Sequence, residues 1–328
     1  MAAPPRAELF RLASGFMITK AIGAAVQLGL PELVSERNRS AAELADAAAA
    51  DPDAITRLLR ALASVGVFTD DGGVIRHTPM SELLVRNTAG SFAAQALVLS
   101  SFQYLTWGES LQAFRTGLPA FPAVHGQPIF DWLAEHPDQA SQFNEAMSGG
   151  ATLRREPLLE RDWSSVSTIV DVGGGSGSTV IALLLAHPHL DGVVFDLPHV
   201  EGEARAAIEQ AELSARCRFA GGSFFESVPP GADVYLMSAI LHDWDDVAGA
   251  AILQTVRTAM HRDSRLLLLE SVLADGNEPD VAKIADLHML VALGGRERTE
   301  PQWRALLTGA GFRVDGIRSG LVEARLDV

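Results

Sequence analysis

The spacing of hydrophobic residues changes along the chain. Residues 53–65 carry apolar side chains every three or four positions, which predicts a helix with one buried face. These side chains are Ile55, Leu58, Leu59, Leu62 and Val65. Upstream, Ser40-Ala-Ala-Glu43 predicts the start of another helix, because its two polar side chains can bind free N–H groups there. Residues 67–75 read as two short strands around a glycine turn, so the pattern predicts helix, helix and hairpin.

The pattern beyond residue 100 indicates a different architecture. Residues 102–161 are helical and rich in aromatic side chains, whereas short apolar runs alternate with helical stretches after Ser165. Expected strands cover 167–171, 192–195, 218–220, 234–237 and 265–269, and expected helices include 178–186 and 200–211. Strand and helix in alternation predict an α/β fold with a doubly wound, mostly parallel, Rossmann-like sheet.

These changes predict three regions. Residues 1–100 form a mainly helical, winged-helix-like domain, 101–160 a helical connector, and 161–328 the sheet domain. Winged helices commonly place a helix in the major groove of DNA. Residues 1–100, however, hold nine Lys and Arg against ten Asp and Glu, without a basic stripe. We therefore expect a dimerisation role for this domain.

Composition narrows the class of partner. The 328 residues are 48% hydrophobic and 20% charged, as in folded globular proteins. The net charge of −15 disfavours binding to nucleic acid or to anionic membranes. No run of roughly 20 apolar residues predicts a membrane span, and a single cysteine, Cys217, forms no internal disulfide. We expect a cytoplasmic protein with a small-molecule ligand and no nucleic-acid or membrane partner.

A glycine-rich turn follows the first expected strand of the sheet. Asp171-Val-Gly-Gly-Gly-Ser-Gly177 lies between strand and helix, at the edge where such sheets bind ligands. Glycines there let a ligand approach the bare backbone. Asp196 ends the next strand, where a carboxylate can bind the hydroxyls of an adenosyl ribose. NAD and S-adenosylmethionine both contain that ribose, but Ser178 replaces the third glycine of the dinucleotide fingerprint and disfavours NAD.

Five motifs together resemble the S-adenosylmethionine-dependent O-methyltransferases, both the plant caffeate type and its bacterial natural-product relatives. The motifs are Asp171-Val-Gly-Gly-Gly-Ser-Gly177, Phe195-Asp196-Leu-Pro, Gly221-Gly-Ser-Phe-Phe225, Leu241-His242-Asp-Trp-Asp-Asp246 and Gly294-Gly-Arg-Glu297-Arg-Thr299. The resemblance spans nearly the whole chain. It implies a methyltransferase sheet with an N-terminal dimerisation domain, a homodimer, and S-adenosyl-L-methionine as cofactor.

The resemblance also implies which residues contact the cofactor. They are Gly173, Gly175, Asp196, Leu197, Ser223, Phe224, Met237, Ser238 and Trp244. Among them, the glycines line the methionine part, Asp196 holds the ribose, and Ser223 and Phe224 flank the adenine. Two positions depart from the family's pattern, because relatives often have Asp at position 223 and plant members often have Lys at position 238.

A base assists methyl transfer to a phenol, because a phenol with a pKa near 10 is mostly neutral at pH 7. His242 is the candidate, since an imidazole with a pKa near 6.5 can accept and then lose a proton. Spacing alone leaves open a helix-start histidine without chemistry, whereas the resemblance implies a general base. It also implies that Glu270 and Glu297 orient the ring. Glu297 could instead pair with a neighbouring arginine at the surface, whereas Glu270 ends an all-leucine strand and needs a buried partner.

Three aspartates near His242 raise the question of a metal site. Asp243, Asp245 and Asp246 are better explained as caps of the helix that follows, since carboxylates near a helix N-terminus are favourable. A base also makes a metal unnecessary. We therefore predict no metal in this site.

The predicted activity is O-methylation of a phenolic hydroxyl on an aromatic secondary metabolite, polyketide or phenazine-like, in antibiotic biosynthesis. The resemblance implies that Phe143, Met147 and Met289 line the acceptor pocket, although a Phe and a Met one helical turn apart are also common in cores. Two alternatives stay open. One is a catalytically inactive, cofactor-binding regulator of the same fold, and the other is an N-methyltransferase.

Overall fold

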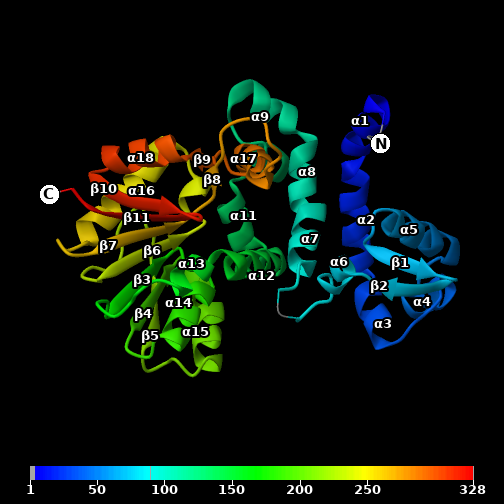
Figure 1. Cartoon of the computed structure of the whole chain (residues 1–328), viewed down its shortest axis with the longest axis horizontal. Coiled ribbons are helices and arrows are strands. Elements are labelled where there is room, and N and C mark those ends of the chain that lie inside the picture. Colours follow the sequence, from blue (N-terminus) through cyan, green and yellow to red (C-terminus); the bar gives the residue numbers. More distant parts are fainter. Residues whose placement is uncertain (1–3, 89, 328) are drawn as a thin grey trace. The chain divides into compact units, whose positions relative to one another are not determined.

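The computed structural model describes residues 4–88 and 90–327, apart from the side chains of residues 151–153 (Figure 1). The chain divides into two compact units. The first contains the chain up to Leu105 together with Pro137–Gly149, and the second contains Thr106–His136 and the chain from Gly150 onward. The expected connector, 101–160, is thus shared between the two units.

The first unit is a helical domain with one hairpin. Its elements are α1 (Pro5–Ala13), α2 (Gly15–Gln27), α3 (Leu30–Glu36), α4 (Ala41–Ala47), α5 (Pro52–Ser64), β1 (Phe68–Asp71), β2 (Val74–His77), α6 (Pro79–Glu82) and α7 (Ala93–Ser100). Ser40 and Glu43 form the predicted capping box at the start of α4. The apolar stripe of α5 is buried at Ile55, Leu59 and Leu62. Val65 lies beyond the helix end and is exposed, so this part of the predicted stripe was wrong.

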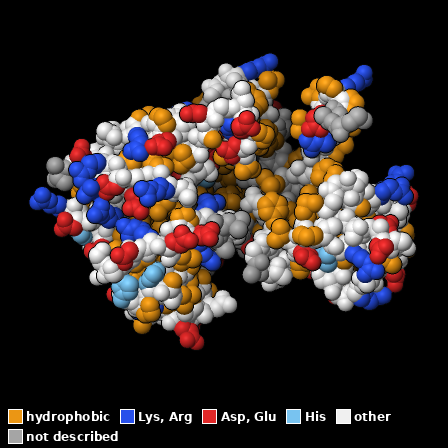
Figure 2. Space-filling model, viewed as in Figure 1, with side chains coloured by type: hydrophobic (Ala, Val, Ile, Leu, Met, Phe, Trp, Pro, Cys, Tyr) orange, Lys and Arg blue, Asp and Glu red, His pale blue; other side chains and the backbone are white. Residues whose placement is uncertain are grey.

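Apolar side chains are exposed at the start of this unit. They are Leu9, Phe10 and Leu12 on α1 and Phe16 and Met17 on α2. Figure 2 shows hydrophobic side chains gathered over α1. Among the described helices, none is long and apolar enough to cross a membrane by itself. Only α1 and α2 taken together, with a bend of 43° between them, meet that criterion.

The second unit contains the large sheet and most of the remaining helices. Two helices, α8 (Phe102–Gly108) and α12 (Pro137–Arg154), run from one unit into the other. The helices within it are α9 (Ser110–Thr116), α10 (Phe121–His125), α11 (Ile129–Glu135), α13 (Glu156–Leu159), α14 (Ser178–Ala186), α15 (Glu201–Gln210), α16 (Asp246–Ala259), α17 (Val281–Ala292) and α18 (Glu300–Gly309), with 3-10 turns η1 (Pro198–Val200) and η2 (Leu241–Asp243). The strands are β3 (Thr168–Val172), β4 (Asp191–Asp196), β5 (Cys217–Gly221), β6 (Val234–Ser238), β7 (Arg265–Leu269), β8 (Val272–Leu273), β9 (Arg298–Thr299), β10 (Phe312–Arg318) and β11 (Leu321–Leu326).

Seven of these strands form one sheet in the order β10-β11-β7-β6-β3-β4-β5. The five strands from β7 to β5 pair in parallel, which confirms the predicted doubly wound, mostly parallel sheet. The hairpin of β10 and β11 adds two antiparallel strands at one side, and the sequence pattern did not predict it. The carboxyl ends of β3, β4, β6 and β7 consequently meet at one edge, where open α/β sheets bind ligands.

Helices cover both faces of the sheet (Figure 1). Neighbouring residues of one strand point to opposite faces, and the strands here are apolar on both. In β3, Val170 packs in the cluster with α16 and α18, whereas Ile169 packs in the cluster with α14 and α15. Burial on both faces fixes the strands firmly, so the loops at their carboxyl ends start from rigid positions.

Candidate active site

Asp196 organises the edge beyond β3 and β4. Its Oδ2 accepts a hydrogen bond from the backbone N–H of Gly175 at 2.7 Å, and its Oδ1 accepts one from Leu197 at 2.6 Å. Burial raises the pKa of Asp196, while these two N–H donors act in the opposite direction. A carboxylate has about four lone-pair sites, so two remain for the hydroxyls of a ribose.

The glycine turn beside this carboxylate is open at Gly175 and closely packed at Gly173. Gly173 has φ of +73°, in the left-handed region, and a Cβ there would meet the side chains of Ile240 and Phe224. The N–H groups of Gly173 and Gly174 both point to the carbonyl of Phe195 in β4. The turn therefore lies against the next strand, and a side chain at its first glycine has no room.

Aromatic rings and one hydroxyl complete this edge. The rings of Phe224 and Phe225 meet Trp244 edge-on, with the Phe225 centroid 4.8 Å away, and Phe130 stacks on Trp244 at 6.1 Å. Ser238, at the end of β6, has a buried Oγ without a hydrogen-bond partner among the described residues. A buried hydroxyl without a partner fits a polar ligand that supplies one.

The remaining predicted cofactor residues differ in exposure. Leu197 is among the exposed hydrophobic residues beside Asp196. Ser223 accepts the N–H of Phe225 at 3.3 Å in the loop after β5. Met237 is fully buried in the sheet core, and its contact with the cofactor stays a prediction.

His242 lies on η2, just past β6, and two glutamates lie beside its ring. Its Nδ1 is 2.9 Å from Oε1 of Glu297 and 3.8 Å from Oε2 of Glu270. Oε1 of Glu270 accepts the backbone N–H groups of Ile240 and Leu241 at 3.1 and 2.8 Å. Glu297 therefore holds the ring, whereas Glu270 holds the backbone turn that carries it.

The loop of Glu297 is fixed from both sides. The backbone N–H of Glu297 donates to Oδ1 of Asp286 at 2.9 Å, and that of Arg296 donates to the carbonyl of His242 at 2.8 Å. A Cβ at Gly295 would collide with the backbone of His242 and Asp243, so only glycine allows this close approach. Glu297 itself is 3% exposed, which rules out the alternative of a surface pair with a neighbouring arginine.

The three aspartates after His242 have three different roles. Asp245 caps α16 by accepting an N–H of its first turn at 2.8 Å, as predicted. Asp246 instead pairs with the buried Arg298 at 2.9 Å. Asp243 does not cap the helix either, because its Oδ1 lies 3.4 Å from Nε2 of His242. The sequence pattern thus missed Asp243 as a member of the histidine cluster.

Burial and charge work against each other in this cluster. Burial alone would lower the pKa of His242, but the three carboxylates around the ring outweigh it and raise the pKa to about 9. Burial also raises the pKa of Asp243 to about 7 and that of Glu270, while the positive charge of His242 opposes both shifts. The ring is therefore a much stronger base than an ordinary imidazole.

The same cluster has the spacing of a metal-ligand set. One atom each of His242, Glu270 and Glu297 lies within 4.8 Å of the others. In the structure, however, the Nδ1–H group of His242 donates to Glu297, so the ring is already paired as an acid–base group. The absence of a metal stays a prediction.

The predicted acceptor-pocket residues are divided between the two units. Phe143 and Met147 are half-buried on α12 in the first unit, and Met289 is half-buried on α17 in the second. Their grouping around one acceptor stays a prediction. Arg154, at the end of α12 in the second unit, was not predicted; its charge opposes the rise in the pKa of Asp243.

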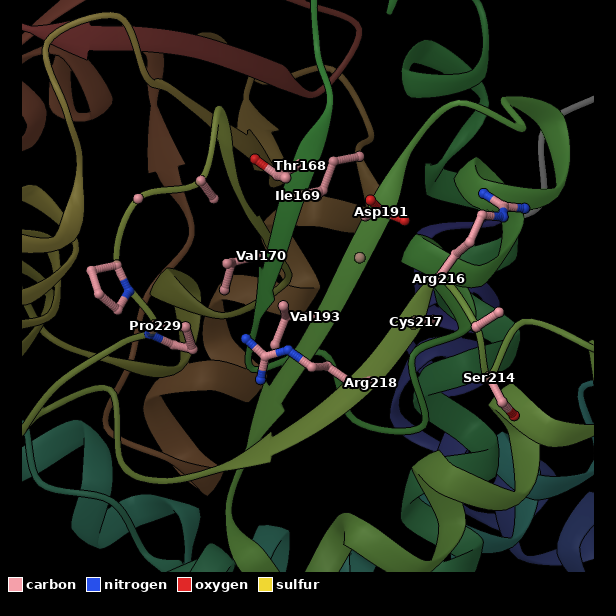
Figure 3. Close-up of a pocket in the computed structure, with 15 residues that line it drawn as sticks. Thr168, Ile169, Val170, Asp191, Val193, Ser214, Arg216, Cys217, Arg218 and Pro229 are labelled. Atoms are coloured by element: carbon pink, nitrogen blue, oxygen red, sulfur yellow. The ribbon is translucent and has the colours of Figure 1, made fainter.

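A separate hollow of about 390 Å³ opens at the other edge of the sheet (Figure 3). It is lined at the starts of three parallel strands by Thr168, Asp191 and Cys217, and by Arg218. These are amino ends, whereas Asp196 lies at a carboxyl end. Because ligands of such sheets bind at the carboxyl edge, we place the active site there and not in this hollow.

Comparison with known proteins identifies the class. The O-methyltransferase domain matches residues 107–313, and the O-methyltransferase dimerisation domain matches residues 10–87. The chain belongs to this family and is an S-adenosylmethionine-dependent O-methyltransferase.

Three relatives illustrate the match. The chain is 37% identical to a phenazine O-methyltransferase of Lysobacter antibioticus, over 99% of this chain and 97% of that protein. It is 38% identical to 3-amino-4-hydroxybenzoate 4-O-methyltransferase of Streptomyces cremeus, over 99% and 90%. A solved O-methyltransferase from neocarzinostatin biosynthesis, in complex with S-adenosylmethionine and 2-hydroxy-5-methyl naphthoic acid, is 33% identical, with a TM-score of 0.83 over 94% of this chain and 96% of its own.

Proposed function

We propose that this O-methyltransferase methylates a phenolic hydroxyl of an aromatic natural product, with His242 as the general base. The hydrogen bond of 2.9 Å between His242 Nδ1 and Glu297 carries the proposal. A carboxylate can only accept, so this bond keeps a proton on Nδ1 and leaves the lone pair of a neutral ring on Nε2. The names of relatives that act on phenazines and hydroxybenzoates support an aromatic acceptor.

The geometry of the sheet edge supports the proposed cofactor residues. Asp196 has lone pairs for ribose hydroxyls, Ser238 a hydroxyl for the methionine part, and the rings around Trp244 an apolar surface for adenine. When bound, S-adenosylmethionine supplies a methyl group on a positively charged sulfur. A Cβ at Gly175 would meet nothing within 4 Å, so the backbone there gives such a ligand access close to the sheet.

The proton then has a defined path through this chain's own residues. The hydroxyl of the acceptor gives its proton to Nε2 of His242, and Nδ1–H stays bonded to Glu297. The imidazolium that results is stabilised by the carboxylates of Asp243, Glu270 and Glu297. With a pKa of about 9, His242 is close to a phenol with a pKa near 10, so the transfer is nearly balanced.

Replacement of His242 tests this proposal. His242→Gln should lower kcat by roughly 10²–10⁴-fold, because general-base catalysis is lost. Binding of S-adenosylhomocysteine, measured by calorimetry, should stay unchanged. His261→Gln is the matched control, since His261 also lies beside an aspartate, Asp233 at 3.6 Å, but outside the site. Equal turnover of His242→Gln and wild type would refute the base. A wild-type protein that binds the cofactor and methylates no phenol would refute the proposed acceptor.

We also infer a homodimer. The family's dimerisation domain and the exposed apolar side chains of α1 and α2 support it. Light scattering should give twice the mass of one chain, and a monomer at micromolar concentration would contradict this.

A further inference from the structure

A second histidine, His288 on α17, has its tautomer set by a tryptophan. Its Nδ1 lies 3.0 Å from Nε1 of Trp107, at the end of α8, and the two rings are inclined by only 10°. The indole N–H is a donor only, so Nδ1 must carry the lone pair that accepts it. In a neutral imidazole the one proton then lies on Nε2.

The ring is also held in its neutral form. Burial and the nearby positive charge of His242 lower the pKa of His288 to about 4. At physiological pH the ring of His288 is therefore uncharged, whereas the ring of His242 is positively charged. The helix that carries His288 also holds the loop of Glu297, because Asp286 Oδ1 accepts the N–H of Glu297 and the carbonyl of Met289 accepts that of Gly295. His288 therefore lies on the helix that borders the catalytic cluster.

The Nε2–H group of His288 is available to a ligand. No described residue accepts a hydrogen bond from it. Nor is Nε2 sealed in the interior, in contrast to the buried oxygens of Glu270 and Glu297 that lack partners. A half-enclosed donor without an acceptor is unfavourable once water is displaced, so a ligand that supplies an oxygen there gains affinity.

We infer that His288 determines specificity: its Nε2–H donates a hydrogen bond to a ketone or carboxylate oxygen of the acceptor, next to the hydroxyl that is methylated. The inference rests on the proposed function, because it places that hydroxyl at His242. A ketone or carboxylate oxygen has lone pairs and no proton, which suits a fixed donor. A phenol without such an oxygen leaves the donor unpaired, and sites of this kind discriminate strongly against the unpaired ligand.

Binding of three matched probes tests the inference without turnover. With S-adenosylhomocysteine present, calorimetry gives Kd for 1-hydroxy-2-naphthoate, 1-hydroxy-2-acetonaphthone and 1-naphthol. Wild type should bind at least one of the first two roughly tenfold more tightly than 1-naphthol. Preference for the carboxylate, for the ketone or for both shows which oxygen His288 binds. Equal binding of all three probes, or no binding of any, would overturn the inference.

Variants of His288 separate the effect of its hydrogen-bond donor from the effect of its side-chain shape. His288→Leu should abolish the preference, while His288→Gln, whose amide nitrogen comes near the place of Nε2, should keep part of it. His288→Asn can still accept from Trp107 but reaches less far, so it should behave like His288→Leu. The loss should appear in KM and leave kcat nearly unchanged. A preference that survives in His288→Leu would refute the role of His288.

This result and the proposed function can fail separately. If wild type prefers the carbonyl probes but methylates none of them, the proposed function fails and the specificity role stands. If wild type methylates phenols but shows no preference that depends on His288, the specificity role fails and the proposed function stands. A shift in melting temperature with S-adenosylhomocysteine shows that each variant is folded.

Discussion

The cofactor edge and the histidine cluster lie on the same sheet but are assembled differently. At the cofactor edge, Gly175 lies in the turn after β3 and Asp196 ends the adjacent strand β4, and backbone N–H groups bind one carboxylate. In the cluster, His242, Glu270 and Glu297 come from three separate segments, and buried carboxylates surround one ring. The first region is therefore set by local turns, whereas the second depends on the tertiary placement of charges.

Among replacements of single carboxylates in the two regions, the larger effect is expected at the cofactor edge. Asp196→Asn removes the charge that would bind ribose and weakens the bonds from Gly175 and Leu197. Hydrogen bonds to a charged group contribute about 1.5–3 kcal/mol, so Kd for S-adenosylhomocysteine should rise roughly 10- to 100-fold. Calorimetry measures this directly.

Asp191→Asn is the matched control for that change. Asp191 begins the same strand, β4, but lies exposed at the opposite edge. It should leave Kd unchanged. Equal Kd values for the two variants would show that the carboxyl edge of β4 does not bind the cofactor.

A smaller effect is expected in the histidine cluster. Glu297→Gln removes one of the negative charges that raise the pKa of His242, so that pKa should fall. The limiting kcat at high pH should drop roughly tenfold, because an amide holds the ring less firmly. Glu270→Gln is the comparison, since Glu270 binds the backbone of η2 and is 3.8 Å from the ring. A kcat in Glu297→Gln equal to that of wild type would contradict a holding role.

The sequence predicted the parallel core of the fold because its strands are continuous apolar runs separated by helices. It also predicted α14 to the residue, Ser178–Ala186. It did not predict β10, an edge strand whose burial nearly alternates, or β11, in which Glu323 and Arg325 interrupt the apolar residues. Edge strands with one exposed face give a weaker signal than buried ones.

Prediction of the cluster was limited by tertiary contacts. Glu270 was expected to be the stronger partner of His242, because it ends a leucine strand, yet Glu297 makes the shorter contact. The loop of Glu297 is held in position by Gly295 and Asp286, and no local sequence pattern indicates these two contacts. The bond between Trp107 and His288, 181 residues apart, has no signal in the sequence at all.

The pH dependence of kcat/KM tests the role of His242 most directly. The base must lose its proton before it can accept another, so the rate should rise with pH through an apparent pKa near 9 in wild type. In Glu297→Gln this rise should occur at lower pH. In the wild type, the apparent pKa should not change when a more acidic phenol is used as acceptor. A rise that follows the acceptor's own pKa, or a flat profile in both proteins, would contradict proton transfer to His242.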